Sequence, residues 1–290
     1  MAISILNNVL SLRVQSDVEN TTAELSSSIQ RLSSGLRING PADDPAGLAV
    51  AESLRADAIV ANVAIRNAND AVSLTTIADS SLEEIGYLLN RMAEVAEQSA
   101  NGVYTQVQRS ALQSEFTALG SEIQRISVTT TFNGSNLLSN SDNVTFQVGI
   151  DGTTNSQLTL EATLGTLESL GLASTGLSAL TYSITGNTST LAQAAALTAL
   201  SAVDSAIDTL SQRRGKLGGF ESRLSYAIEY ITVARDNFVA AESRIRDLDV
   251  ASEVANMISL QVRQQAATAI LAQANQAPAT AVALLRDSLG

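Results

Sequence analysis

The sequence predicts a mostly α-helical protein, with long helices towards both ends of the chain and a small β-rich region between them. Only three prolines occur in 290 residues, which favours long uninterrupted helices. Hydrophobic residues make up 45% of the chain but aromatic residues only 3%. Ala, Leu, Ile and Val therefore have to fill the core, and they suit the packing of helix against helix.

The start of the chain is predicted to form a helix with one apolar stripe. Steps of three, four or seven residues separate the apolar positions, close to a heptad repeat. The opposite face carries Ser, Thr, Asn and Gln with few charges. Two interpretations stay open, an amphipathic core helix or a helix packed on several sides. The apolar positions are Ile3, Leu6, Leu10, Val14, Val18, Leu25, Ile29, Leu32 and Leu36.

A loop is expected at residues 39–41, followed by the start of a second helix. Asp44 is the predicted N-cap, and Pro45 takes the first helical position, where its missing N–H costs nothing. Asp43 and Asp44 together also resemble a metal site or an acid–base pair. Capping is favoured because no other type of ligand lies nearby in the sequence.

Three further helices are indicated by apolar periodicity, over residues 46–100, about 106–127 and about 190–246. The third is weakened at Gly218 and Gly219. A last helical segment is rich in Ala and Gln, and small side chains allow close approach of helix axes. Its predicted apolar face consists of Val254, Ile258, Val262, Ala266, Ala269 and Ile270.

The β-rich region is predicted from a change of period. A run of β-branched residues ends in a turn at Asn133 and Gly134. Apolar and polar residues then alternate over 144–150 and again over 158–162, with a turn signal at 151–152, which indicates a β-hairpin. Gly, Ser, Thr and Asn dominate residues 140–190. We expect this region to be exposed, and residues 169–187 to be replaceable by a Gly/Ser linker.

Composition excludes several functional classes. The chain has no Cys and no His, so disulfides, zinc fingers, thiol nucleophiles and imidazole bases are excluded. The net charge of −12 argues against nucleic acid as a partner. Residues 1–44 carry a net charge of −2 and residues 251–290 carry none, which leaves −10 in the middle. Nearly neutral ends and an acidic middle suggest buried ends and an exposed middle.

Neither a cleaved signal peptide nor a membrane span is expected. The first fifteen residues lack the basic-then-apolar layout of a signal peptide. Residues 264–285 carry no charge, but Gln, Asn and Pro interrupt any apolar run of spanning length.

Six segments of the chain form an ordered set of motifs. They are IQRLSSGLRING at 29–40, ADDPAGLAVAE at 42–52, RNANDAVSL at 66–74, TTFNGSNLL at 130–138, SRIRDLDVASEVANM at 243–257 and QQAATAILAQANQAPATAVALLR at 264–286. Together they resemble the N- and C-terminal signatures of bacterial flagellins. The resemblance covers about residues 1–140 and 190–286, and the middle is unmatched.

The resemblance implies a hairpin-shaped subunit that polymerises into the flagellar filament. Residues 1–44 and 251–290 would pair as a terminal coiled coil, the inner domain, and residues 45–250 would form an outer helical domain. Such a subunit is exported unfolded, secreted, and assembled at the filament tip. The implied partners are further copies of the chain, the export apparatus and an export chaperone, and the filament cap and hook-junction proteins. No cofactor is implied.

Two predictions follow from this resemblance. Residues 1–40 and 251–290 are expected to be disordered in the monomer and to fold on polymerisation, because a two-helix contact offsets only part of the ordering entropy. In some flagellins a convex helical face binds a Toll-like receptor. The run LLNRMAEVAEQS at 88–99 resembles that face and keeps Leu89, Arg91, Glu94 and Gln98 of its pattern. Glu115 matches an acidic position on the neighbouring helix. Ala93 replaces a second Arg of the family pattern, so weak recognition is expected.

Three other classes of protein share some of these features. A hook–filament junction protein shares the N-terminal signature, but the C-terminal match argues against it. An intracellular coiled-coil scaffold requires charged residues beside its apolar stripe, whereas Ser, Gln, Asn and Ala flank the stripes here. An enzyme is disfavoured because a zinc protease needs H-E-x-x-H, and neither a G-x-S-x-G turn nor a Gly-rich phosphate loop occurs.

Overall fold

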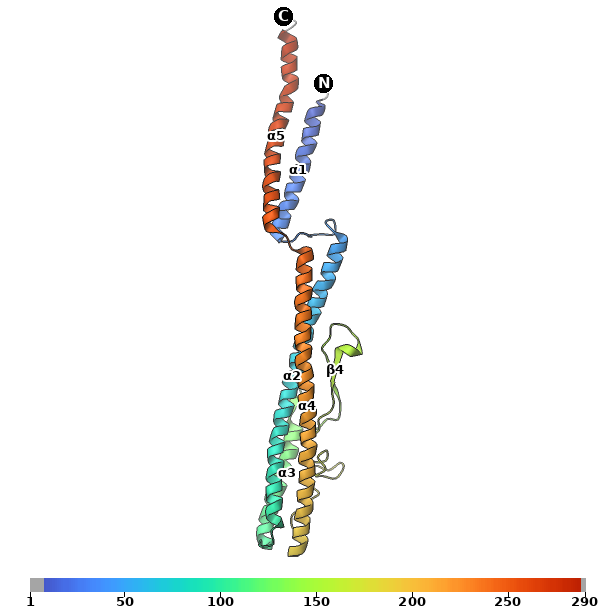
Figure 1. Ribbon diagram of the computed structural model, residues 1–290, viewed down its shortest axis with the longest axis vertical. Coiled ribbons are helices and arrows are strands. Elements are labelled where there is room, and N and C mark those ends of the chain that lie inside the picture. The colour runs from blue at the N-terminus through green and yellow to red at the C-terminus, as the bar shows by residue number, and fades with distance from the viewer. Residues whose placement is uncertain (1–7, 288–290) are drawn as a thin grey trace. The chain divides into compact units, whose positions relative to one another are not determined.

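The computed structural model describes residues 8–287 and is mostly α-helical (Figure 1), which confirms the predicted fold class. Ile3 and Leu6 of the predicted N-terminal stripe lie outside the described residues. In chain order the helices and strands are α1 (Val9–Ser34), α2 (Pro45–Ala100), α3 (Gln106–Thr129), β1 (Thr131–Phe132), β2 (Ser135–Asn136), β3 (Val144–Gln147), β4 (Gln157–Leu160), α4 (Ser189–Arg246) and α5 (Val250–Asp287).

The chain divides into two compact units. The first comprises Met1–Ala58 and Asp236–Gly290, and the second comprises Ile59–Arg235. The boundaries fall inside α2 and α4, since each of these helices contributes to both units. The division expected from the sequence, at residues 44/45 and 250/251, falls instead at the start of α2 and one residue into α5, and it stays a prediction.

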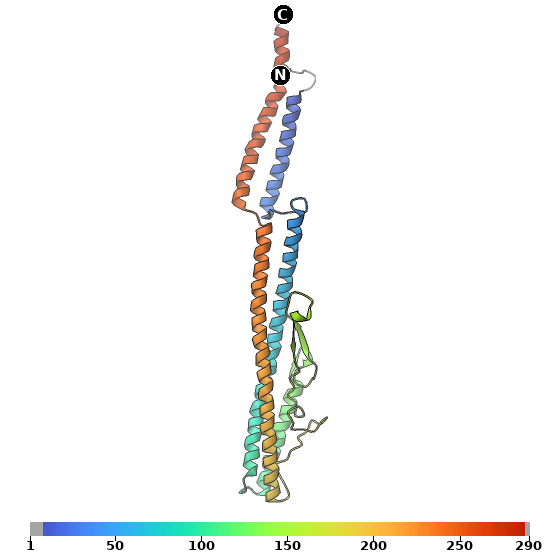
Figure 2. The ribbon, with the colours of Figure 1, turned by 45° about the vertical axis from the view of Figure 1, so that its right-hand side comes forward.

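In the first unit, α1 and α5 lie side by side (Figures 1 and 2). α1 begins after Asn8, whose side-chain oxygen accepts a hydrogen bond from the Ser11 N–H at 3.1 Å. It ends at Gly35, where φ is 72°, a left-handed conformation that favours a residue without Cβ. Immediately afterwards Leu36 forms an antiparallel bridge with Asp247, which brings the end of α1 beside the start of α5.

The two neighbouring aspartates before α2 serve local backbone structure. Asp44 Oδ1 accepts hydrogen bonds from the N–H groups of Ala46 and Gly47 at 3.1 and 2.9 Å, which confirms Asp44 as the N-cap. Asp43 Oδ2 accepts from Asn39 and Gly40 in the preceding loop. No group of three or more candidate metal ligands occurs among the described residues. The pair therefore caps a helix and closes a loop.

The second unit is a bundle in which α2, α3 and α4 run along one another (Figures 1 and 2). Its core is aliphatic, as the composition predicts, with Phe116 as a fully buried aromatic residue. Large side chains of α2 and α3 pack against mostly small side chains of α4, which allows close packing. The core residues contributed by the three helices include Leu82, Ile85, Leu89, Met92, Val95, Phe116, Ile123, Ala196, Ala199, Val203, Ala206 and Leu210.

Helix α4 is continuous through Gly218 and Gly219. One 18-residue stretch of it has a mean hydropathy of 1.3, long and apolar enough to cross a membrane by length and composition alone. Core helices of soluble proteins meet the same criterion. The buried residues of α4, such as Ala196 and Val203, pack in the bundle core, and 28% of that stretch is buried.

Two small antiparallel strand pairs lie between α3 and α4. β1 and β2 join through Asn133 and Gly134, whose φ angles of 49° and 80° fit the predicted turn. β3 pairs with β4 from Val144 opposite Leu160 to Gln147 opposite Gln157, which confirms the hairpin. Both strands are shorter than predicted. The ladder ends at Gln147 because the next two N–H groups both donate to the carbonyl oxygen of Ser156.

The exposure and β-structure expected of residues 140–190 do not extend over the whole segment. Strands cover only residues 144–147 and 157–160 of it, within the described part of the chain. Its irregular remainder buries four large aliphatic side chains in the core of the second unit. Polar composition concealed them, because they are single apolar residues among Ser, Thr and Gly. They are Leu167, Leu170, Leu172 and Ile184.

Candidate assembly surface and receptor face

Helix α1 faces α5 with a heptad seam that is half polar. The least exposed positions of α1 alternate by three and four residues, as in a coiled coil. Val14, Val18 and Leu25 were predicted from the apolar stripe. The seam also uses small polar residues that the apolar pattern missed, and Leu10 and Ile29 of the predicted stripe are about half exposed. The seam positions are Ser11, Val14, Val18, Thr21, Leu25, Ser28 and Leu32.

Helix α5 has apolar residues on two different faces. The seam towards α1 consists of Met257, Leu260, Gln264, Ala267, Leu271 and Ala274. The face predicted from the sequence is a second one: Ile258, Val262 and Ile270 on it are 52%, 59% and 53% exposed. A helix that is apolar on two faces needs partners on both. The α1–α5 pair supplies one of them.

Polar contacts fix the register of the helix pair. Asn8 donates its side-chain N–H to the carbonyl oxygen of Ala274 at 2.7 Å, and Ser11 Oγ donates to Asn275 Oδ1 at the same distance. Further along, Gln264 Nε2 donates to Thr22 Oγ1 at 2.9 Å. Because a shift of one residue would break all three contacts, they define how α1 and α5 align.

Three of the four residues of the predicted receptor face form an exposed ionic cluster. Arg91 on α2 donates from Nε to Glu115 Oε1 on α3 at 2.9 Å and from a terminal nitrogen to Glu94 Oε2 at 2.7 Å. Hydrogen bonds to Glu94 and then Glu115 raise the pKa of the Arg91 guanidinium. Leu89 is fully buried in the bundle core, so it supports this face from below and is not part of its surface.

Comparison with known proteins shows the family of this chain. The family model for the bacterial flagellin N-terminal helical region matches residues 5–143, and that for the C-terminal helical region matches residues 200–285. A flagellin of Halalkalibacterium halodurans is 38% identical over 259 residues, covering 89% of this chain and 90% of the relative. The chain belongs to the bacterial flagellin family. The flagellin helical regions are therefore the two parts that the sequence motifs indicated.

A second relative supports membership of this family over nearly the whole length of the chain. The flagellar filament 33 kDa core protein of Treponema phagedenis is 35% identical over 290 residues, covering 97% of this flagellin and 99% of the relative. Flagellins are structural subunits of the flagellar filament and not enzymes. The predicted function and the predicted lack of catalysis are thereby confirmed.

A solved structure assigned to the flagellar hook-associated proteins, from Vibrio parahaemolyticus, shares the fold. Its TM-score is 0.57 at 14% sequence identity, covering 71% of this flagellin and 100% of that chain. This likeness concerns the fold alone. It does not favour the hook–filament junction alternative, because the sequence identity to flagellins is much higher.

Proposed function

We propose that this flagellin polymerises through the α1–α5 pair, with residues 1–44 and 251–290 as an inner domain and residues 45–250 as the outer one. The observation that carries this proposal is the second apolar face of α5. Ile258, Val262 and Ile270 lie there without cover. In a filament, the terminal helices of neighbouring copies would cover that face, which also explains the near-neutral ends of the chain.

The terminal segments are expected to fold on assembly. Ordering a residue costs about 1–2 kcal/mol of backbone entropy, so two helices of this length cost tens of kcal/mol. The seam between them offsets little of this, because Ser, Thr and Gln occupy many of its positions. Apolar contacts with further copies would supply the remainder. We therefore expect residues 8–40 and 251–287 to be disordered in the monomer.

Hydrogen exchange on monomer and filament tests this proposal. Amides of residues 10–30 and 255–275 should exchange without protection in the monomer and should be strongly protected in the filament. Amides of the buried α2 and α4 residues in the second unit, protected in both states, serve as the internal control. Strong protection of the terminal segments in the monomer would contradict folding on assembly.

Export in an unfolded state fits the same properties. A chain without Cys forms no disulfide that could obstruct threading through a narrow channel. The inferred partners are the flagellar export apparatus and an export chaperone, then the filament cap and the hook-junction proteins. The inferred location is the extracellular filament. Shearing filaments from cells and assaying the chain in the sheared, membrane and cytosolic fractions tests this, and retention in the cytosol would contradict it.

A second candidate function is recognition by a Toll-like receptor at the Arg91 cluster. Arg91 is half exposed, as a binding hot spot at the centre of a helical face requires. Glu94 and Glu115 already neutralise it, so an acidic receptor residue has to compete with two carboxylates. Weak recognition is expected.

A cell reporter assay tests the receptor face with Arg91→Ala. A matched control is Arg125→Ala, since Arg125 is also exposed and pairs with the carboxylate of Glu122 on its own helix. The expected result is a lower signal for Arg91→Ala alone. Equal signals from the parent, Arg91→Ala and Arg125→Ala would exclude this face as the receptor site.

A further inference from the structure

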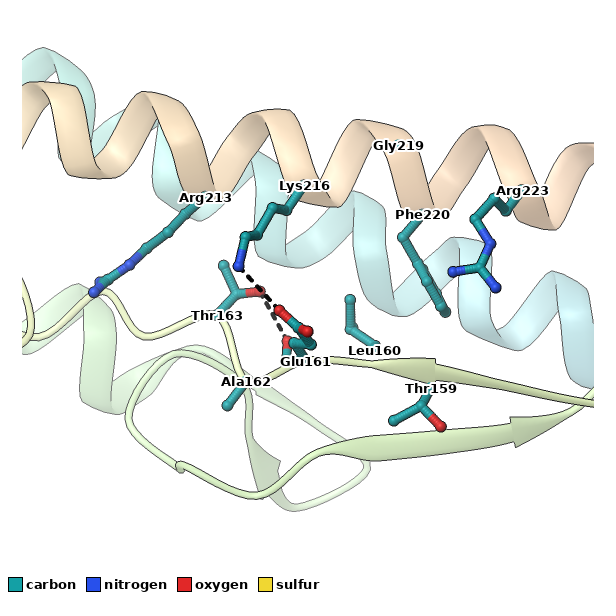
Figure 3. Close-up of a pocket in the computed structure, with 10 residues that line it drawn as sticks. All are labelled: Thr159, Leu160, Glu161, Ala162, Thr163, Arg213, Lys216, Gly219, Phe220 and Arg223. Atoms are coloured by element: carbon teal, nitrogen blue, oxygen red, sulfur yellow. Dashed lines mark hydrogen bonds and ion pairs between the residues drawn. The ribbon is translucent and has the colours of Figure 1, made fainter. Parts of the chain in front are cut away.

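A groove of about 470 Å³ lies between α4 and the chain segment of residues 159–163, which begins in β4 (Figure 3). Three cationic side chains of α4 line it, against one carboxylate from the facing segment. The groove thus carries a charge of +2 in a chain whose net charge is −12. The four charged lining residues are Arg213, Lys216, Arg223 and Glu161.

The positive charge of this groove is poorly compensated. Arg213 donates only to neutral acceptors, the carbonyl oxygens of Leu164 and Ser169 and the Ser169 hydroxyl. Arg223 makes no hydrogen bond or ion pair with any described residue. Lys216 pairs with Glu161 at 3.0 Å, but the two side chains are 74% and 72% exposed, and such a pair contributes little. The groove therefore has charge available for an outside anion.

A complementary acidic pair lies elsewhere on α4. Asp204 and Asp208 are one helical turn apart, exposed, and without a hydrogen bond or ion pair among the described residues. Like charges at this spacing destabilise a helix. At about 100° per residue, the two aspartates lie about 110° around α4 from the groove cations, so one copy presents both surfaces on different sides.

We propose that the groove of one copy binds Asp204 and Asp208 of a neighbouring copy, with Arg223 and Lys216 as the cations of the contact. The two surfaces differ, so the contact is heterologous, and a heterologous contact whose rotation does not close repeats into an open helical polymer. It also gives acidic subunits an attractive contact in place of mutual repulsion. This inference rests on the proposed polymerisation through the terminal helices and adds a second contact to it.

A charge swap tests the contact in the full-length chain. The variants are Arg223→Asp, Asp208→Arg and the double variant, and the readout is the critical concentration for seeded assembly at low salt. Each single variant should raise that concentration about tenfold, and the double variant should return to within about threefold of the parent. Arg66→Asp, the same charge change at an exposed arginine of α2, should change it less than about twofold.

Circular dichroism of each monomer verifies that the fold is intact. Parent-like assembly of both single variants, or a double variant no better than either single one, would overturn the contact. A deletion of residues 264–290 is measured alongside. The deletion is expected not to assemble, and it tests polymerisation through the terminal helices alone. The charge-swap variants test the groove contact, so the two proposals are contradicted by different variants.

Discussion

Arg109 on α3 is 1% exposed and makes no ion pair with a described carboxylate. Its guanidinium donates to the carbonyl oxygen of Ser189 at 3.1 Å and to that of Asn101 at 3.0 Å. These acceptors lie at the start of α4 and in the turn after α2, so one side chain joins three helices. Backbone carbonyl oxygens thus compensate part of the buried charge, while the buried Nε has no partner among the described residues.

Replacing Arg109 by Ala is expected to destabilise the second unit by about 2–4 kcal/mol, because a buried side chain and its hydrogen bonds are lost together. Urea unfolding of the monomer, followed by circular dichroism, measures the change. Arg66→Ala, at an exposed position of α2, is the control and should stay within about 0.5 kcal/mol of the parent. Similar values for both variants would show that Arg109 contributes no more than a surface residue.

The stability of the loop before α2 depends on pH through the carboxyl group of Asp43. Hydrogen bonds from the Asn39 N–H, from Arg31 and from the Gly40 N–H lower the pKa of its carboxyl below 3.8. A lowered folded-state pKa adds stability that is present above 3.8 and is lost as pH falls through the folded value. In the filament, where residues 31–40 are expected to be ordered, Asp43→Asn should therefore flatten the acid limb of the depolymerisation profile below pH 4, measured by sedimentation. Asp142→Asn, at an exposed carboxylate without a described partner, should leave the limb unchanged.

Residues 161–188 act as an irregular element that completes the bundle core. Replacing residues 169–187 by a Gly/Ser linker, expected from the sequence to be harmless, should instead destabilise the second unit, because it removes Leu170, Leu172 and Ile184. Leu172→Ala alone should cost about 2–5 kcal/mol. A Gly/Ser replacement of the exposed residues 174–179 is the matched control and should cost less than about 1 kcal/mol in urea unfolding. Equal stability of both replacements would show that Leu170, Leu172 and Ile184 contribute nothing to the stability of the core.

The two faces of α5 have different expected roles. One face pairs with α1, and the exposed face contacts further copies of the chain. Val262→Asn changes the exposed face and should prevent polymerisation while the unfolding of the second unit stays the same. Gln261→Asn, at a polar exposed position beside it, is the control and should polymerise normally. Sedimentation of seeded mixtures measures the outcome. Polymerisation of Val262→Asn at the parent's critical concentration would exclude this face as an assembly surface.

At the scale of the whole molecule, the chain has two compact units. We therefore expect a truncation within the first unit to leave the second unit folded. Deleting residues 264–290 removes most of the α5 seam and should abolish filaments. The second unit, Ile59–Arg235, has its own core and should keep its thermal transition within about 2 °C of the parent. Electron microscopy and calorimetry measure the two effects. Loss of that transition on deletion would show that the second unit depends on the terminal helices.

Local sequence rules found most elements of this flagellin because the relevant forces act within a few residues. The Asp44 cap, the turn at Asn133 and Gly134, and the long helices all depend on neighbours along the chain. The Arg91 cluster was also found, since its residues occur at fixed motif positions. Leu89, which the motif match assigned to the receptor face, is buried beneath that cluster, because a motif match gives residue types and not which side of α2 is covered.

The sequence by itself determined the fold class, the helix order and the family, since periodicity, caps and motifs are written in consecutive residues. Only the tertiary structure decided which apolar residues meet. It assigned Met257 and Leu260 to the seam of α5 and left Val262 exposed, although all three are apolar. It also placed Leu172 in the core and gathered Arg213 and Arg223 in one groove. Which side chains are buried or in contact depends on which elements pack together in space, and the local sequence around a residue does not specify this.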